Sequence, residues 1–179
     1  MKMQSLEKNI PLSASRLWQA QRDYFSKEGI NAWQDQVPFF VTSNPFIAKT
    51  YAKLIAAYLK DLTSNPEEPI YIFELGTGSG QFSFYCLQAL LQEMPEANFC
   101  YVMTDFTESN IAFWEQQAVL KQFSMLDFAQ FDCEHPKPIW LRKQKITLNK
   151  LKNPCILLGN YIFDKYLCLI NCRALVEHF

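Results

Sequence analysis

The sequence predicts an α/β domain, a doubly wound and mostly parallel sheet with an N-terminal helical cap. From residue 70 onward, short apolar segments of strand length alternate with amphipathic segments of helix length, which is the pattern of a parallel sheet with right-handed crossovers. The first apolar segment ends in an acid and three alternating glycines, which is typical of a tight turn from a strand into a helix. The 179 residues suffice for one hydrophobic core but not comfortably for two, so we expect a single domain.

Each element follows from a local pattern. Strands are expected at residues 70–75, 98–104, 127–131 and 155–159, where short apolar runs occur. Helices are expected at residues 12–27, 45–62, 81–94 and 107–117, where apolar residues recur near helical spacing. Residues 137–152 form an uncertain connector with some helical character. The domain then divides into an N-terminal helical cap (1–66), a ligand-binding core (67–164) and a divergent tail (165–179).

Composition disfavours several kinds of partner. The net charge is −1 and no basic block occurs, so a broad electrostatic face for nucleic acid is not expected. No apolar run approaches the roughly 20 residues that cross a bilayer, and residues 1–11 lack the apolar core of a signal peptide. Six cysteines without a CxxC pair and two histidines favour buried thiols over disulfides or a metal site. We therefore expect a reduced, cytoplasmic protein with no metal and with neither a nucleic-acid nor a membrane partner.

A glycine motif indicates a nucleoside-containing ligand at the end of the first strand. The motif reads Glu74-x-Gly76-x-Gly78-x-Gly80. A turn without Cβ atoms lets a ligand approach the backbone, and the free N–H groups of the following helix point to the same place. Dinucleotide-binding sheets would have a third small residue where this chain has Gln81, and a P-loop would add a Lys-Ser/Thr pair. The alternative is a plain strand-to-helix turn that needs small residues.

A second acid, Asp105, directly follows the second strand. Ligands of doubly wound sheets lie outside the carboxyl ends of the strands, where an acid can accept hydrogen bonds from both ribose hydroxyls. The alternative role for Asp105 is to cap the helix that begins near Thr107. Since Thr107 can cap that helix itself, we expect Asp105 to bind ribose.

The glycine motif resembles the first motif of the class I S-adenosylmethionine-dependent methyltransferases, which have a Rossmann-like core. The stretch from Asn160 to Asp164, Asn-Tyr-Ile-Phe-Asp, is similar to that of a poorly described group of bacterial methyltransferase-like proteins. It is more distantly similar to the mitochondrial-type protein-arginine methyltransferases that assist complex I assembly. Residues 42–46 and 103–107 also fit the bacterial group, and the resemblance covers about residues 17–164.

The resemblance implies S-adenosylmethionine as the cofactor. In such proteins the first acid and the glycine loop hold the methionine end, and an acid after the third strand accepts a hydrogen bond from the adenine amino group. The end of the fourth strand faces the transferred methyl group. The implied cofactor-binding residues are Glu74, Gly76, Thr77, Gly78, Gly80, Asp105, Phe106, Asp132 and Asn160, and the implied catalytic residues, which face the acceptor, are Asn160 and Asp164.

A further one of these positions has an alternative, and so does the N-terminal segment. Phe106 is expected to pack on the adenine face, whereas Asp132 is as well explained as a turn residue. Residues 33–46 and the helix after them either close over the cofactor as a lid or form a packed cap.

After Asp164 the sequence departs from the resemblance. The family continues through further strands, whereas here only residues 165–179 follow, with one apolar run at 166–170. We therefore expect a C-terminally truncated half-sheet whose fourth strand offers an open edge to a dimer or a hetero-complex.

The expected function is S-adenosylmethionine-dependent methyl transfer to an unidentified protein or small-molecule acceptor. The alternative is a non-catalytic module that binds the cofactor weakly, or acts by pairing through its open edge. A nicotinamide-dependent oxidoreductase is disfavoured by the position of the third glycine.

Overall fold

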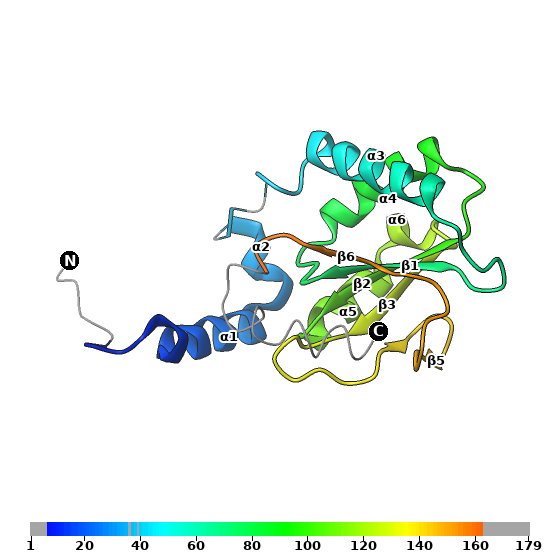
Figure 1. Ribbon diagram of the computed structural model, residues 1–179. Coiled ribbons are helices and arrows are strands. Elements are labelled where there is room, and N and C mark those ends of the chain that lie inside the picture. Colours follow the sequence, from blue (N-terminus) through cyan, green and yellow to red (C-terminus); the bar gives the residue numbers. More distant parts are fainter. Residues whose placement is uncertain (1–6, 36, 39, 163–179) are drawn as a thin grey trace.

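The computed structural model describes residues 7–35, 37–38 and 40–162 (Figure 1). Four parallel strands form its main sheet: β1 (Ile70–Leu75), β2 (Phe99–Asp105), β3 (Leu126–Gln130) and β6 (Ile156–Gly159). Their order is β3-β2-β1-β6. The predicted fold class is confirmed, and no strand end differs from the predicted one by more than one residue. Because the strand order reverses between β1 and β6, the carboxyl ends of these two strands form the topological switch point where such sheets bind ligands.

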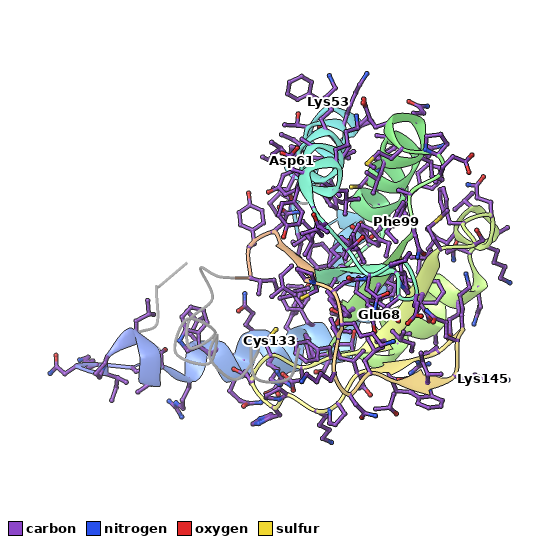
Figure 2. All side chains as sticks on the ribbon, turned by 45° about the vertical axis from the view of Figure 1, so that its right-hand side comes forward. Lys53, Asp61, Glu68, Phe99, Cys133 and Lys145 are labelled. Atoms are coloured by element: carbon purple, nitrogen blue, oxygen red, sulfur yellow. The ribbon has the colours of Figure 1, made fainter. Side chains whose placement is uncertain are left out.

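One face of the sheet carries the helices. They are α3 (Pro45–Asp61), α4 (Gln81–Glu93), α5 (Glu108–Gln116) and α6 (Ala118–Lys121). Alternate strand residues such as Ile72, Tyr101 and Phe128 pack against them in one core cluster. Figure 2 shows Lys53 and Asp61 on the outside of α3, whereas Phe99 is buried. The expected helix at 107–117 ends at Gln116 and is followed by the separate turn of α6.

Local sequence explains where the main helices begin. The side chain of Asn44 accepts a hydrogen bond from the backbone N–H of Ile47 (3.0 Å), and Pro45 occupies the first helical position of α3. The N-terminal segment contains a short 3₁₀ turn, η1 (Leu12–Ala14), and α1 (Arg16–Glu28), which starts later than predicted because Ser15 caps it. A second 3₁₀ turn, η2 (Gly29–Asn31), and α2 (Ala32–Asp35) follow. None of the described residues of α1 is buried.

The opposite face of the sheet is covered by the connection from β3 to β6. This connection carries the hairpin of β4 (Trp140–Leu141) and β5 (Ile146–Thr147), so the expected helical character of residues 137–152 is wrong. The reason lies outside the segment. The buried carboxylate of Asp127 accepts the backbone N–H groups of Lys143 (2.8 Å) and Gln144 (3.1 Å), which fixes the hairpin turn beside β3. No helix among the described residues has the length and apolar character to span a membrane.

Candidate functional site

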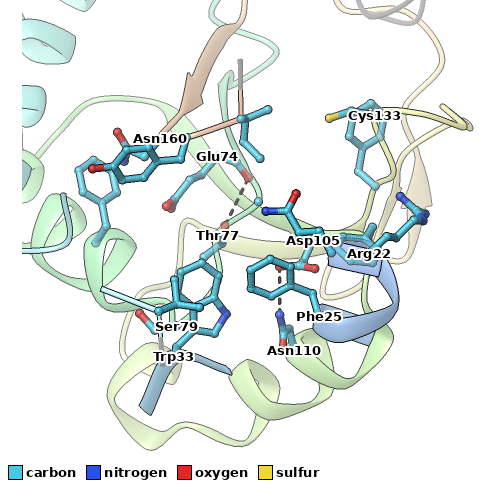
Figure 3. Close-up of a pocket in the computed structure, with 18 of the residues that line it drawn as sticks. Arg22, Phe25, Trp33, Glu74, Thr77, Ser79, Asp105, Asn110, Cys133 and Asn160 are labelled. Atoms are coloured by element: carbon cyan, nitrogen blue, oxygen red, sulfur yellow. Dashed lines mark hydrogen bonds between the residues drawn. The ribbon is translucent and has the colours of Figure 1, made fainter. Parts of the chain in front are cut away.

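A pocket of about 460 Å³ lies at the carboxyl ends of the strands, under the N-terminal helices (Figure 3). Its volume falls in the range of small-molecule sites, roughly 300–1,000 Å³. Residues that follow all four main strands line it together with residues of α1 and the segment after it. The lining includes Arg22, Phe25, Trp33, Glu74, Gly76, Thr77, Ser79, Asp105, Phe106, Asn110, Asp132 and Asn160.

The glycine loop after β1 has a backbone that requires glycine. Gly76 and Gly78 both have φ of 62°, and Gly80 has φ of 79°, in the left-handed region that other residues rarely adopt. A Cβ at Gly78 would lie 2.7 Å from the indole of Trp33, and one at Gly76 would collide with the side chain of Ile162. All three positions therefore require glycine for their backbone conformation, and at Gly76 and Gly78 a neighbouring side chain also lies too close for a Cβ.

Hydrogen bonds hold this loop to β2 and α5. The backbone N–H of Thr77 donates to the carbonyl of Thr104 (2.9 Å), and the Thr77 hydroxyl accepts the Thr104 N–H (3.2 Å). The indole N–H of Trp114 donates to the carbonyl of Gly78 (3.0 Å). Thr77 is thus both a lining residue and a buried link between two strand ends, which makes the loop a rigid floor of the pocket.

Glu74, at the end of β1, is a buried carboxyl group that lines the pocket. One of its oxygens accepts hydrogen bonds from the hydroxyl of Tyr101 (2.8 Å) and from that of Ser83. Burial raises the pKa of Glu74 to about 7, and these two hydrogen bonds only partly oppose the shift. The charge of this group therefore changes near neutral pH.

Replacing Glu74 with glutamine is expected to change how stability depends on pH. Between the ordinary pKa of 4.5 and the folded value of about 7, the folded chain holds a proton that the unfolded chain has released. The free energy of unfolding of the wild type therefore falls as pH rises through this range, by about 3 kcal/mol in total. Urea denaturation should show Glu74→Gln gaining that amount relative to the wild type between about pH 5 and about pH 8.

Glu96→Gln is the matched control, because Glu96 is exposed. Its stability should follow that of the wild type at every pH. Parallel curves for Glu74→Gln and the wild type would contradict the raised pKa of Glu74.

Asp105 directly links β2, α5 and the glycine loop. Its Oδ1 accepts the N–H (2.9 Å) and the hydroxyl (2.8 Å) of Thr107, and its Oδ2 accepts the amide of Asn110 (3.0 Å). A backbone hydrogen bond from Gly78 also favours its charged form, although burial raises the pKa of Asp105 overall. The alternative role, fixing the start of α5, is therefore present in the structure. Asp105 still lines the pocket, and ribose binding stays a prediction.

Phe106 and Asp132 both line the pocket, and both contact Arg22, a residue that the sequence did not single out. The guanidinium of Arg22, from α1, lies 4.5 Å from the ring centroid of Phe106. The same group pairs with Asp132, which also accepts the backbone N–H of Glu134 (3.0 Å), as a turn residue does. A single arginine in an amphipathic helix gives no signal in the sequence that it reaches across to β3.

Asn160 follows β6 and lines the pocket on the side of Glu74 (Figure 3). Its Oδ1 accepts a hydrogen bond from the hydroxyl of Tyr51 (3.4 Å) in α3. Asp164, the other residue expected to face an acceptor, lies outside the described residues. The pocket thus brings together described residues from all four strand ends, as expected, while their individual roles stay predictions.

The chain matches no protein-family model, and no curated protein sequence matches it significantly. One solved structure to which the chain is similar is described as the structure of the citrinin polyketide synthase CMeT domain. The two chains are 23% identical, with a TM-score of 0.43, over 70% of this chain and 28% of the other. The chain therefore spans less than a third of the length of that structure.

Proposed function

We propose that the pocket binds S-adenosylmethionine and that the chain supports methyl transfer to a protein or small-molecule acceptor. The observation that carries the proposal is the grouping of four strand ends around one pocket at the switch point. The glycine loop, Asp105, Phe106 and Asn160 line this pocket. An acid and three glycines after β1 agree with this cofactor class better than with a dinucleotide, whose fingerprint needs its third small residue at Gln81.

The residues present fit such a cofactor. Gly76 and Gly78 have no Cβ, so a ligand can approach the loop backbone at these two positions once the side chains of Ile162 and Trp33 move. Gly80 gives α4 no side-chain cap, although the N–H of Gln81 donates to the Ser79 hydroxyl (3.3 Å); the positive end of this helix would favour an acidic group. Glu74 would face the cationic amino group of the methionine end, Asp105 the ribose and Phe106 the purine.

The bound cofactor would supply an electrophilic methyl group, and the chain would supply alignment and a dry site. Asn160 is held by Tyr51 at the end of β6 and would orient the acceptor. Phe25 and Trp33 stack with ring centroids 5.6 Å apart and would exclude water. Glu74 in its charged form would hold the cationic end, so binding should weaken as pH falls below about 7.

Calorimetric titration of the 179-residue chain tests the proposal. S-adenosylmethionine and S-adenosylhomocysteine should both bind with micromolar affinity, whereas NAD should not bind. Absence of binding by both adenosyl ligands, at pH values on either side of 7, would contradict the proposal. Binding of NAD alone would move the assignment to an oxidoreductase.

A second candidate is a non-catalytic module that acts by pairing. The observation in its favour is β6, which pairs with β1 on one side and with no other strand among the described residues. Such an edge is a template for a strand of another chain. Sedimentation of the purified chain should show a dimer if this edge pairs with a second copy. A monomer that turns over cofactor would count against this function.

A further inference from the structure

Arg22 forms the most extensive charged contact around the pocket. Its Nη1 lies 3.2 Å from Asp132 Oδ1 and 2.9 Å from Glu134 Oε2, while its Nη2 pairs with Asp132 Oδ2. The three side chains are each about three-quarters buried. Two-pronged pairing of a guanidinium with a carboxylate is among the stronger ion-pair geometries, and partial burial limits its screening by salt. α1 is therefore fastened to the end of β3.

The same guanidinium also covers Phe106. Its central carbon lies 4.5 Å from the ring centroid, within the range of a cation–π contact. Phe106 and Asp132 are the two residues assigned above to the purine, one to its face and one to its amino group. Both are engaged by one side chain, so a purine and Arg22 cannot use them together.

A second contact of the same N-terminal segment covers the other end of the site. Trp33 lies against Gly78 so closely that a Cβ there would be 2.7 Å from the indole. Phe25 of α1 stacks on Trp33, which connects this cover to the helix that carries Arg22. The segment therefore closes the pocket at the glycine loop and at the β3 end together.

We propose that Arg22 is a gate: its guanidinium competes with the purine of the cofactor for Phe106 and Asp132, and α1 must release before the cofactor binds. The inference rests on the proposed function and deepens it. In a chain that is mostly closed, the apparent affinity equals the intrinsic affinity multiplied by the open fraction. Removing the Arg22 side chain should therefore tighten cofactor binding, whereas removing a residue that only contacts the cofactor would weaken it.

The test compares Arg22→Ala with Arg16→Ala by calorimetry with S-adenosylhomocysteine. Arg16 lies on the same helix, and its side chain is 77% exposed, with Nε 3.9 Å from the carboxylate of Glu7. Arg22→Ala should bind about tenfold more tightly than the wild type, and Arg16→Ala should bind like the wild type.

Hydrogen exchange in the ligand-free chain gives an independent readout. Amides of α1 should exchange faster in Arg22→Ala by about the factor gained in affinity, because both report the open fraction. Arg22→Lys keeps the charge but loses the two-pronged geometry, so it should show a smaller gain; it replaces the alanine variant if that variant does not fold.

Each outcome of the calorimetric comparison either supports or overturns the gate. Tighter binding by Arg22→Ala than by the wild type supports the gate. Equal or weaker binding by Arg22→Ala overturns the gate and leaves the proposed function standing. No binding by any variant overturns both.

Discussion

Replacing Asp105 with alanine is expected to weaken binding of S-adenosylhomocysteine by more than tenfold. The carboxylate stands at the end of β2 and lines the pocket, and a charged acceptor that faces both ribose hydroxyls contributes more than a neutral one. The same change should lower the free energy of unfolding by about 3 kcal/mol, since it leaves buried donors of Thr107 and Asn110 without their acceptor. Calorimetry and urea denaturation measure the two effects separately.

Thr107→Val separates ribose binding from the structural role of Asp105. It removes the 2.8 Å hydroxyl contact to Asp105 and keeps the carboxylate and the side-chain shape. We expect a stability loss of about 1 kcal/mol with unchanged affinity. If Asp105→Ala kept wild-type affinity at a temperature where it is fully folded, Asp105 would be only the residue that starts α5.

Replacing Gly78 with alanine should lower both stability and ligand affinity strongly. The residue would keep φ near 62°, which costs about 1–2 kcal/mol for a side chain with a Cβ, and would collide with Trp33. Binding of S-adenosylhomocysteine should fall more than tenfold, because the new Cβ displaces Trp33, which lines the pocket, and distorts the loop that would hold the ligand. Thermal unfolding and calorimetry measure the two losses.

The double variant Gly78→Ala with Trp33→Ala divides that cost into its parts. Trp33→Ala removes the indole, so the added methyl group no longer collides and only backbone strain remains. Gly78→Ala should therefore cost less stability in the Trp33→Ala background than in the wild type. Equal costs in both backgrounds would show that Trp33 does not lie over Gly78 in solution.

The main sheet could be predicted because its signals are local. Residues 70–75 are apolar except for Glu74, and β1 is buried throughout, which is the pattern of a central parallel strand. The Asn44–Pro45 pair similarly marks the start of α3. The hairpin between β3 and β6 could not be predicted, since its turn depends on Asp127, a residue that sequence places far from Lys143 and Gln144.

The position of the site and its main residues could be predicted from the sequence, but the contacts among the lining side chains could not. The glycine loop and the acid after β2 follow from residue type and spacing alone. The contact between Arg22 and Asp132 joins residues 110 positions apart, and no periodicity relates them. The sequence left two roles open for Asp105, because an acid before a helix can serve either the helix or a ligand. Its hydrogen bonds to Thr107 and Asn110 belong to the first role.

The most direct test of the central claim is a crystal structure of the chain with S-adenosylhomocysteine. We predict that the ligand lies across the carboxyl ends of the strands. Its ribose would be within hydrogen-bond distance of Asp105, its purine would lie over Phe106, and its sulfur would lie between the glycine loop and Asn160. A ligand bound away from these strand ends, or with its purine outside the pocket, would contradict the proposed cofactor site.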